Sequence, residues 1–304
     1  MVLGPSFHWQ HGKVKQILPV QTHGKATWVR MQPRRLPGWH RREVKNIVPG
    51  QKLGKPMRAG MRPGVAATRN AASRAGTVCM CECLQDCLHA RCNNYRCMHV
   101  RRLQTLRPVQ RHVDLLDSSG ALGLEGIVQE TVQVARVGRS EDQIAVEWSE
   151  KARRFLGQVG APGLPCGLSQ QIQRDCVEVG MVMAKMFPDT EDMLLKLELM
   201  GNMFCPRWHQ DSVKCRVIIT YNGLGTVYAP HDNVNLWALE NHRSNDHIVR
   251  DASDVLRAYS GDVLLMKGKR FPNAVNGLVH RSPDFRYHAD GSIMHRLCLK
   301  IDVD

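Results

Sequence analysis

The stretch Trp208–Thr226, WHQDSVKCRVIITYNGLGT, decides the fold that we expect for this chain. From Cys215 to Tyr221, apolar and β-branched residues recur at every second position, and that alternation is typical of a β-strand. The Asn- and Gly-rich run Asn222–Gly225 then indicates a turn. We therefore expect this stretch to form a strand and a tight turn inside a sheet.

The sequence on both sides of this stretch predicts helices first and strands afterwards. Two amphipathic runs are expected to be helices, the second with Ser169 as its N-cap, and four further runs are expected to be strands. The helices cover Ile144–Phe155 and Ser169–Met186, and the strands Leu195–Leu199, Val263–Met266, Leu278–Arg281 and Ile293–Val303. Helices followed by short strands with Gly and Asp turns favour an α+β fold, in which a β-sandwich or barrel carries an N-terminal helical cover.

The chain has 304 residues and a formal net charge of +14, and this charge is unevenly distributed. Residues 1–110 carry 20 Lys and Arg against three acids, whereas residues 111–304 carry 22 against 25. We therefore predict a basic, disordered extension over 1–110 and a globular domain over 111–304, with a helical lead-in at 111–190 and a β-barrel core at 191–304. Nucleic acid is not an expected partner of the nearly neutral domain, and only the basic tail would bind it.

The basic segment Met1–Arg74 allows three interpretations. Its Arg-rich, acid-poor composition fits an organelle transit segment, an arm that binds phosphate backbones, or a dispensable extension with initiation further along, at Met57 or Met61. The chain shows no apolar secretory signal and no run of the ~18 apolar residues that a membrane span needs. We therefore expect an intracellular protein, cytoplasmic or organellar, that does not enter a membrane.

Six of the 11 cysteines fall between Cys79 and Cys97, with His89 and His99 nearby. This run fits either a zinc site or a low-complexity segment without function, because it lacks the longer gap that usually separates two pairs of zinc ligands. An odd total without a secretory signal favours reduced thiols over a disulfide framework.

The residues with the clearest chemical pattern are His209-Gln210-Asp211 and, on a later strand, His280. Two imidazoles and one carboxylate on one side of a metal form the facial triad of non-haem iron(II) sites, which leaves three coordination positions open. Residues i and i+2 of a strand point to the same side, so His209 and Asp211 supply two of these ligands. His280 supplies the third if the fold brings its strand alongside.

The order of the motifs carries a family resemblance. Gly223–Thr226, Gly261–Leu265, His280–Pro283 and Arg296 follow one another in an order that resembles the double-stranded β-helix, a jelly-roll or cupin-like barrel, of iron(II)/2-oxoglutarate oxygenases such as prolyl hydroxylases and phytanoyl-CoA hydroxylase. The resemblance implies iron(II) and 2-oxoglutarate as cofactors and an oxidoreductase activity of the dioxygenase type.

Two blocks are also similar to the hallmark blocks of the domain-of-unknown-function family 1826. They are Trp208–Thr226 and Gly261–Pro283, the latter reading GDVLLMKGKRFPNAVNGLVHRSP. Weaker likeness extends back to about residue 111. This family has no established activity, so membership names no substrate.

We assign the binding of 2-oxoglutarate to Arg296, Arg216 and Tyr221. The resemblance implies that Arg296, on the strand after the distal histidine, holds the far carboxylate, and a guanidinium suits that role. Alternation places Arg296 with Cys298 and Lys300, on a face that could also be the solvent face. Arg216 is the alternative clamp.

Two rival interpretations stay open. In the first, Cys205 joins the triad and closes a tetrahedral zinc site, which makes the protein a non-enzymatic metal-binding protein. In the second, the triad is vestigial and the fold is a scaffold. The substrate itself is unknown. The basic loop with Lys267, Lys269 and Arg270 indicates that it is anionic, although the same charges would serve solubility alone.

Overall fold

The computed structural model describes residues 76–102, 107–122, 126–135, 138–159, 163–201, 205–272 and 277–304, and four short strands near the N-terminus. The chain divides into two units, Met1–Gly60 and Met61–Asp304. In the first unit β1 (Phe7–Gln10) pairs with β2 (Lys13–Gln16), and β3 (Val20–Thr22) with β4 (Lys25–Thr27). Of the extension predicted to be disordered over 1–110, residues 78–100 form strands and short helices in the second unit, so the prediction is wrong there, and the other parts of the extension before residue 76 lie outside the described residues apart from these hairpins.

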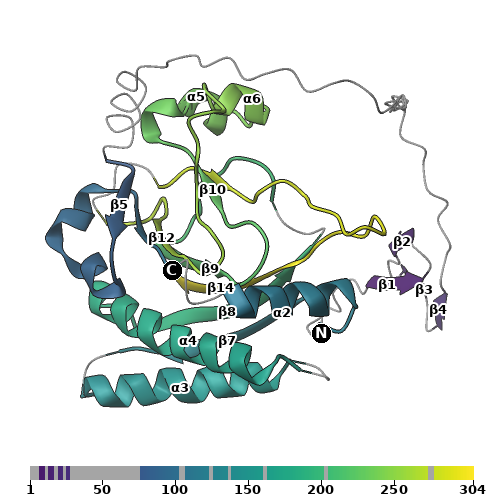
Figure 1. Ribbon diagram of the computed structural model, residues 1–304, viewed down its shortest axis with the longest axis horizontal. Helices are drawn as coiled ribbons and strands as arrows, with labels where there is room; N and C mark the ends of the chain where they lie inside the picture. Colours follow the sequence, from purple (N-terminus) through teal and green to yellow (C-terminus); the bar gives the residue numbers. More distant parts are fainter. Residues whose placement is uncertain are drawn as a thin grey trace, which may run out of the picture. The chain divides into compact units, whose positions relative to one another are not determined.

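Two sheets form the core of the second unit (Figure 1). The large sheet has seven strands in the order β5-β6-β12-β9-β14-β8-β7, and the small sheet has three in the order β11-β10-β13. The strands are β5 (Val78–Cys81), β6 (Cys97–Val100), β7 (Ile127–Gln133), β8 (Asp192–Met200), β9 (Cys215–Thr220), β10 (Val227–Tyr228), β11 (Leu256–Arg257), β12 (Val263–Lys267), β13 (His280–Arg281) and β14 (Arg296–Val303). The predicted α+β class is confirmed, but within the described residues the sheets do not close into the predicted barrel.

Two long helices, α3 and α4, cover one face of the large sheet, while β10 lies on its other side (Figure 1). The helices of this unit are η1 (Leu84–Leu88), η2 (Ala90–Asn94), α2 (Arg107–Ser118), α3 (Glu141–Gly157), α4 (Cys166–Met186), η3 (His231–Asn233), α5 (Leu236–Glu240) and α6 (Asn245–Ile248). Both predicted long helices are therefore present. Among the described residues, no helix has the length and apolar character required to cross a membrane.

The start of each long helix has a local cause. The Ser140 hydroxyl accepts from the backbone N–H of Gln143, and the Gln143 side chain accepts from the N–H of Ser140, which is a capping box at the start of α3. The prediction of Ser169 as the N-cap of α4 was wrong. Pro165 is the N-cap, and its carbonyl accepts the N–H groups of Leu168 and Ser169, so Ser169 lies inside the first turn.

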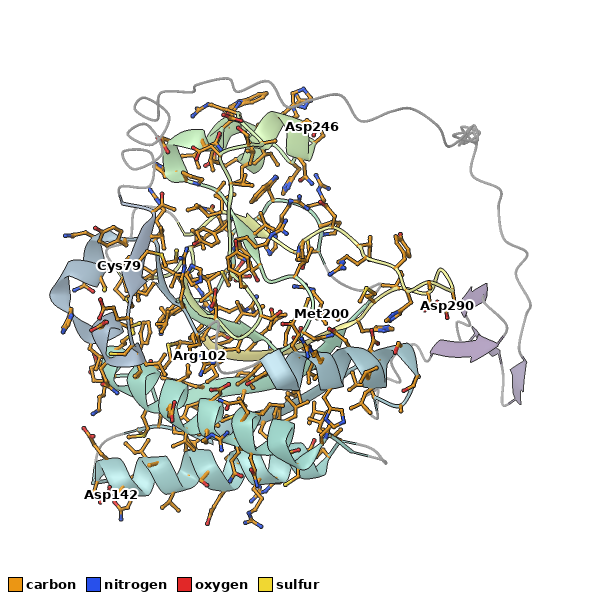
Figure 2. The ribbon with its side chains drawn as sticks, in the orientation of Figure 1. Cys79, Arg102, Asp142, Met200, Asp246 and Asp290 are labelled. Atoms are coloured by element: carbon orange, nitrogen blue, oxygen red, sulfur yellow. The ribbon has the colours of Figure 1, made fainter. Side chains whose placement is uncertain are left out.

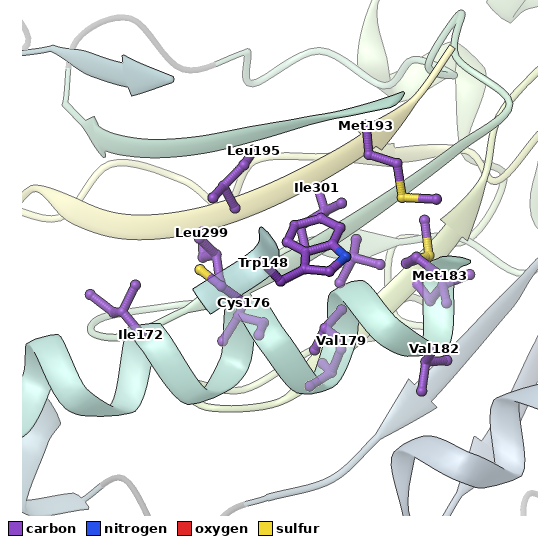
Figure 3. Packing of buried hydrophobic residues seen from close by; sticks show 14 of the residues in the cluster. Trp148, Ile172, Cys176, Val179, Val182, Met183, Met193, Leu195, Leu299 and Ile301 are labelled. Atoms are coloured by element: carbon purple, nitrogen blue, oxygen red, sulfur yellow. The ribbon is translucent and has the colours of Figure 1, made fainter. Parts of the chain in front are cut away.

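The strand alternation that the sequence predicts separates the two faces of the large sheet. Leu195 and Leu197 of β8 point toward the helices, as do Leu299 and Ile301 of β14, and all four are buried there (Figure 3). The helices pack on each other just as tightly, because a Cβ at Gly180 would lie 2.3 Å from the Trp148 ring. The helical cover therefore fixes the position of the sheet that carries the site.

The opposite face of the large sheet points toward the small sheet. Cys298 and Ile218 pack there against Tyr228 of β10. Lys300 lies on this face too, with only about 12 % of its side chain exposed, and it is paired with Glu198. The face that Arg296 shares with Lys300 is therefore the space between the sheets, and not the solvent face that the sequence left open.

The predicted domain boundary at residue 110 differs from the structure. β6 pairs antiparallel with β12, and β5 pairs parallel with β6, so the Cys-rich run forms one edge of the large sheet. The composition of the segment did not indicate that it belongs to the sheet, because the run is short and its two strands have only four residues each. Figure 2 labels Cys79 on this segment.

Candidate metal site between the sheets

The structure brings together the three residues that the sequence selects as ligands. His209 donates its backbone N–H to the carbonyl of His280, and His280 donates in return to His209, both over 2.9 Å. Their rings lie side by side, with centroids 4.4 Å apart. Asp211 follows at i+2, and one candidate ligand atom from each residue lies within 4.8 Å of the others. A single pair of backbone hydrogen bonds thus joins two distant segments into one cluster.

Each imidazole is oriented by a backbone carbonyl. His209 Nδ1 lies 2.8 Å from the carbonyl oxygen of Arg207, and His280 Nδ1 lies 3.1 Å from that of Leu278. A proton on Nδ1 that is donated to these carbonyls leaves Nε2 as the lone-pair donor of each ring. Burial lowers the pKa of His280 to about 4, so its ring is neutral near pH 7. Both rings therefore suit a metal ion.

Asp211 has one satisfied and one unsatisfied carboxylate oxygen. Its Oδ1 accepts from Arg216 Nη1 over 2.7 Å, whereas its buried Oδ2 has no hydrogen-bond donor among the described residues. This Oδ2 lies 3.4 Å from His280 Nε2. A buried carboxylate oxygen without a partner is costly, and a divalent cation would satisfy it. Two imidazoles and a carboxylate are also the donor set of the facial triad, so the residues present fit such an ion.

Arg216 does not have the role that the sequence predicts for it. Its Nε and Nη2 donate to the two oxygens of Asp302 over 2.6 and 2.8 Å, and its Nη1 donates to Asp211. Burial alone would lower the pKa of Arg216, but the bonds to Asp302 and the charge of Asp211 outweigh it and raise the pKa above its ordinary value. Arg216 is committed to these two carboxylates, so it orients Asp211 and is not a clamp for 2-oxoglutarate.

Replacing Asp302 by asparagine is expected to lower the affinity for a divalent metal by about 10- to 100-fold. The reason is that Arg216 loses Asp302, one of its two ionic partners and the one that fixes its guanidinium, and so holds Asp211 less firmly in one orientation. Calorimetric titration with Mn²⁺ measures the change. The control is Asp304→Asn, which removes an exposed carboxylate two residues further on that pairs with Arg270. Equal affinities for the two variants would contradict the positioning role.

The loop after β12 holds the backbone of Asp211. Lys269 donates its N–H to the carbonyl of Asp211, and Gly268 donates to that of Lys214, both over 2.9 Å. A Cβ at Gly268 would lie 1.9 Å from the carbonyl oxygen of Val213. Only glycine therefore allows this loop to approach the ligand-bearing segment so closely.

A cavity of about 200 Å³ opens beside His209 and His280, two of the three candidate ligands. The residues that line it come from both sheets and from the segment before His209: Glu198, Met200, Cys205, His209, Arg216, Ile218, Thr226, Met266, His280, Arg281, Ser282 and Lys300. Sequence reasoning missed Glu198, Arg281 and Ser282 as parts of this wall. Alternation along β8 places Glu198 on the same face of the strand as Lys196 and Met200. The sequence does not tell which face points to the cavity, so this position could not be recognised in advance.

Arg281 adds a cation to this wall. It follows His280 directly, its guanidinium lies over the ring of Trp208, and its Nη1 pairs with Asp284 over 2.6 Å. Its buried Nε has no hydrogen-bond partner among the described residues. Arg281 therefore lines the cavity beside His280 with one buried N–H that has no acceptor among the described residues.

Arg296 is buried directly behind the cavity wall. It is 5 % exposed, its Nη1 donates to the carbonyl of Leu224 over 3.0 Å, and its Nη2 lies 3.2 Å from the Ser282 hydroxyl. Nη2 also lies 3.7 Å from the sulfur of Met200. Ser282 and Met200 both line the cavity, whereas Arg296 itself lines a separate, smaller pocket with Leu224 and Pro283.

Tyr221 lies on the opposite face of the sheet, which contradicts its assignment to the co-substrate. Its hydroxyl donates to Asp175 of α4 over 2.7 Å, and the whole side chain is buried under the helices. Because strand residues alternate between faces, the inner position of Arg216 and Ile218 places Tyr221 on the helix side. It is a residue of the helix-packed core.

Cys205 lines the cavity but does not belong to the ligand cluster. The group of possible ligands beside this cavity consists of His209, Asp211 and His280, and the Cys205 thiol points instead to the carbonyl of Arg207 at 3.7 Å. The closed tetrahedral zinc site that the sequence left open is therefore not formed by these residues.

In the basic loop that was predicted to attract an anionic substrate, the Lys267 side chain is not exposed to solvent. This residue is 3 % exposed, and its ammonium donates to the backbone carbonyls of Cys92 and Asn93 over 3.1 and 2.7 Å. Arg270 is exposed but pairs with Asp304. Lys267 therefore belongs to the packing of the Cys-rich segment.

The chain has low similarity to several solved structures. A complex of the dioxygenase for auxin oxidation 1 from Arabidopsis thaliana with 2-oxoglutarate has 7 % identity and a TM-score of 0.36, over 75 % of this chain and 91 % of that one. A C-terminally truncated protein from Neurospora crassa, in its apo form, has 10 % identity and a TM-score of 0.29, over 80 % and 90 % of the chains. The full-length form of that N. crassa protein, in complex with alpha-KG, has 10 % identity and a TM-score of 0.30, over 80 % and 82 %.

A search of curated proteins gave no match. The family model described as "Protein of unknown function (DUF1826)" matches residues 123–302, which is more than half of the chain. This segment contains both sequence blocks that resembled the family, and it includes His209, Asp211 and His280, the three candidate metal ligands. The chain therefore belongs to the DUF1826 family.

Proposed function

We propose that the protein is an iron(II)- and 2-oxoglutarate-dependent oxygenase whose metal is held by His209, Asp211 and His280. The observation that carries the proposal is the buried Oδ2 of Asp211, which has no hydrogen-bond donor among the described residues and lies beside two imidazoles whose Nδ1 atoms face carbonyls. Hard carboxylate and borderline imidazole donors in this ratio suit iron(II).

The number of ligands favours an enzyme over a zinc-binding protein. Structural zinc sites are closed by four protein ligands, whereas catalytic metal sites keep open positions. The described residues supply three ligands, and two of them, His209 and His280, line the cavity of about 200 Å³. Cys205, the only fourth ligand that the sequence suggested, points elsewhere.

The strand order supports the corresponding fold. Along the chain, β9 lies in the large sheet, β10 and β11 in the small sheet, β12 in the large, β13 in the small and β14 in the large. This alternation between two facing sheets is that of a jelly roll. We propose that the unit is an open double-stranded β-helix, with its metal ligands where the small sheet meets the segment before β9.

Arg296 is our proposed anchor for the far carboxylate of 2-oxoglutarate. Its guanidinium is buried beside Ser282 and Met200, which line the cavity, and a guanidinium in such a position binds a carboxylate through two parallel hydrogen bonds. Arg216 is already committed to Asp211 and Asp302. Of the two arginines assigned from the sequence, Arg296 is therefore the one that suits the co-substrate.

The residues of the chain contribute position and exclusion of water. Bound iron(II) with 2-oxoglutarate supplies oxidising power from dioxygen, which no side chain of this protein provides. Arg216 fixes Asp211, the carbonyls of Arg207 and Leu278 fix the imidazoles, and Met200, Ile218 and Met266 form an apolar wall that keeps bulk water away.

The test is an anaerobic titration of the full chain with Fe²⁺ and 2-oxoglutarate. We expect a metal-to-ligand charge-transfer band and, once dioxygen is admitted, formation of succinate from 2-oxoglutarate. Arg296→Met should raise the KM for 2-oxoglutarate at least about tenfold, which corresponds to the loss of a charged hydrogen bond. Arg243→Met is the control, because Arg243 lies over the exposed Trp237 outside the cavity. Absence of both the band and the succinate from iron-loaded protein would refute the function.

A further inference from the structure

A second group of possible metal ligands lies away from the cavity, in the Cys-rich segment at the edge of the large sheet. Cys79, Cys81, Cys87 and Cys92 are each 5 % exposed or less, and none of these four forms a disulfide. Ligand atoms of Cys79, Cys81 and Cys92 lie within 4.8 Å of one another. Four buried thiols in one small segment need an explanation beyond packing.

Local structure brings these sulfurs together. Cys79 and Cys81 are at i and i+2 on β5, so their side chains point to the same face, while Met80 between them is exposed. The two short helices η1 and η2 then return the chain over that face. As a result the Cys92 sulfur lies 3.2 Å from that of Cys79, and the Cys87 thiol is hydrogen-bonded to Cys81.

We propose that Cys79, Cys81, Cys87 and Cys92 bind one zinc ion as a tetrathiolate site that stabilises this segment. A tetrahedral zinc site with Zn–S bonds of about 2.3 Å places its sulfurs about 3.8 Å apart, and the ligand atoms of Cys79, Cys81 and Cys92 lie within 4.8 Å of one another. On binding, each thiol releases its proton to solvent and coordinates as a thiolate. The site is independent of the iron site, with which it shares no residue.

The charge beside the cluster supports this assignment. Lys267 is buried, and it has no carboxylate partner among the described residues. Its ammonium is held by the carbonyls of Cys92 and Asn93, which belong to the ligand-bearing segment. Zinc with four thiolates carries two negative charges, and such an anion would compensate the buried ammonium.

The other two cysteines of the run show why four are assigned. Cys83 is exposed, and Cys97 points to the opposite face of the sheet, where its thiol donates to the carbonyl of Thr77. Cys83 therefore serves as a matched control within the same segment. It has the same chemistry and lies only two residues from Cys81.

The experiment uses the full chain with His209→Ala and His280→Ala, so that metal at the iron site does not contribute. Zinc content is measured by mass spectrometry, and the protein is then loaded with Co²⁺. We expect one zinc per chain, and thiolate-to-cobalt charge-transfer absorption with the intense visible bands of tetrahedral cobalt. Absence of these bands would overturn the proposal, as would a Cys79–Cys92 disulfide found in freshly purified protein.

Single substitutions in the same background then assign the ligands. Cys81→Ser should lower the zinc affinity by more than about 100-fold, and Cys83→Ser should leave it unchanged. Equal loss in both variants, or in neither, contradicts the assignment. The cobalt spectrum does not depend on these variants, so a failure of Cys81→Ser to fold leaves the proposal testable.

Discussion

Replacement of His280 by alanine is expected to lower the affinity of the chain for Fe²⁺ by more than about 100-fold, and to abolish succinate formation. Loss of a residue that only supports a metal ligand costs about 10- to 100-fold, so loss of a ligand should exceed that range. His280 is the most deeply buried of the three ligands, and its ring is held by the Leu278 carbonyl beside the unpartnered Asp211 oxygen. Without it, the remaining two ligands bind a metal only weakly.

The matched control is His247→Ala. His247 is exposed, and the hydrogen bond described for its ring is with the Ser244 hydroxyl, so loss of the ring should change neither metal binding nor succinate formation. Both variants are checked for native circular dichroism before titration. If His280→Ala folds and binds Fe²⁺ as tightly as the unchanged chain does, the triad assignment fails.

The second large effect concerns stability, at Asp175 under the helices. Replacing Asp175 by alanine is expected to lower the free energy of unfolding by about 3–5 kcal/mol, the typical result of removing one partner of a buried ion pair. Asp175 is fully buried, accepts from Arg102 over 2.6 Å, and accepts from the Tyr221 hydroxyl. Burial alone would lower the pKa of Arg102, but Asp175 outweighs it and raises the pKa, so the guanidinium stays charged and would lose its partner.

Urea unfolding followed by circular dichroism measures this change. Asp189→Ala removes an exposed carboxylate just after α4 and should shift the free energy of unfolding by less than about 0.5 kcal/mol. Asp175→Asn should fall between the two, because it retains an acceptor for Tyr221 but loses the charge. A cost for Asp175→Ala as small as that for Asp189→Ala would show that water satisfies Arg102.

The grouping of His209, Asp211 and His280 could be predicted from the sequence because their pattern is local or chemically distinctive. His209 and Asp211 are two residues apart. His280 lies near the end of a short apolar run that is followed by the turn-forming residue Pro283. The role of Arg216 could not be predicted. Its partner Asp302 becomes visible only when the register of β9 against β14 is known, and a shift of one residue would turn Arg216 toward the helices.

The predicted helices and strands follow from periodicity, which is a property of neighbouring residues. The closure of the sheets and the position of the Cys-rich strands depend on pairing between distant segments. β6 has only four residues, and its partner β12 lies more than 160 residues later. Periodicity within a segment does not predict which distant strand that segment pairs with. The domain boundary predicted at residue 110 therefore separated two strands of the large sheet from the rest.

The pairing of β6 with β12 also determines what a shortened chain would expose. The segment that matches the family begins at residue 123, after both strands of the Cys-rich segment. A chain trimmed to that segment would lose β5 and β6, and the fully buried strand β12 would become the border of its sheet. Unpaired backbone groups along an apolar border are a template for pairing with another molecule. The first hundred residues therefore include β5 and β6, which cover the edge of β12 and prevent it from pairing with the sheet of another molecule.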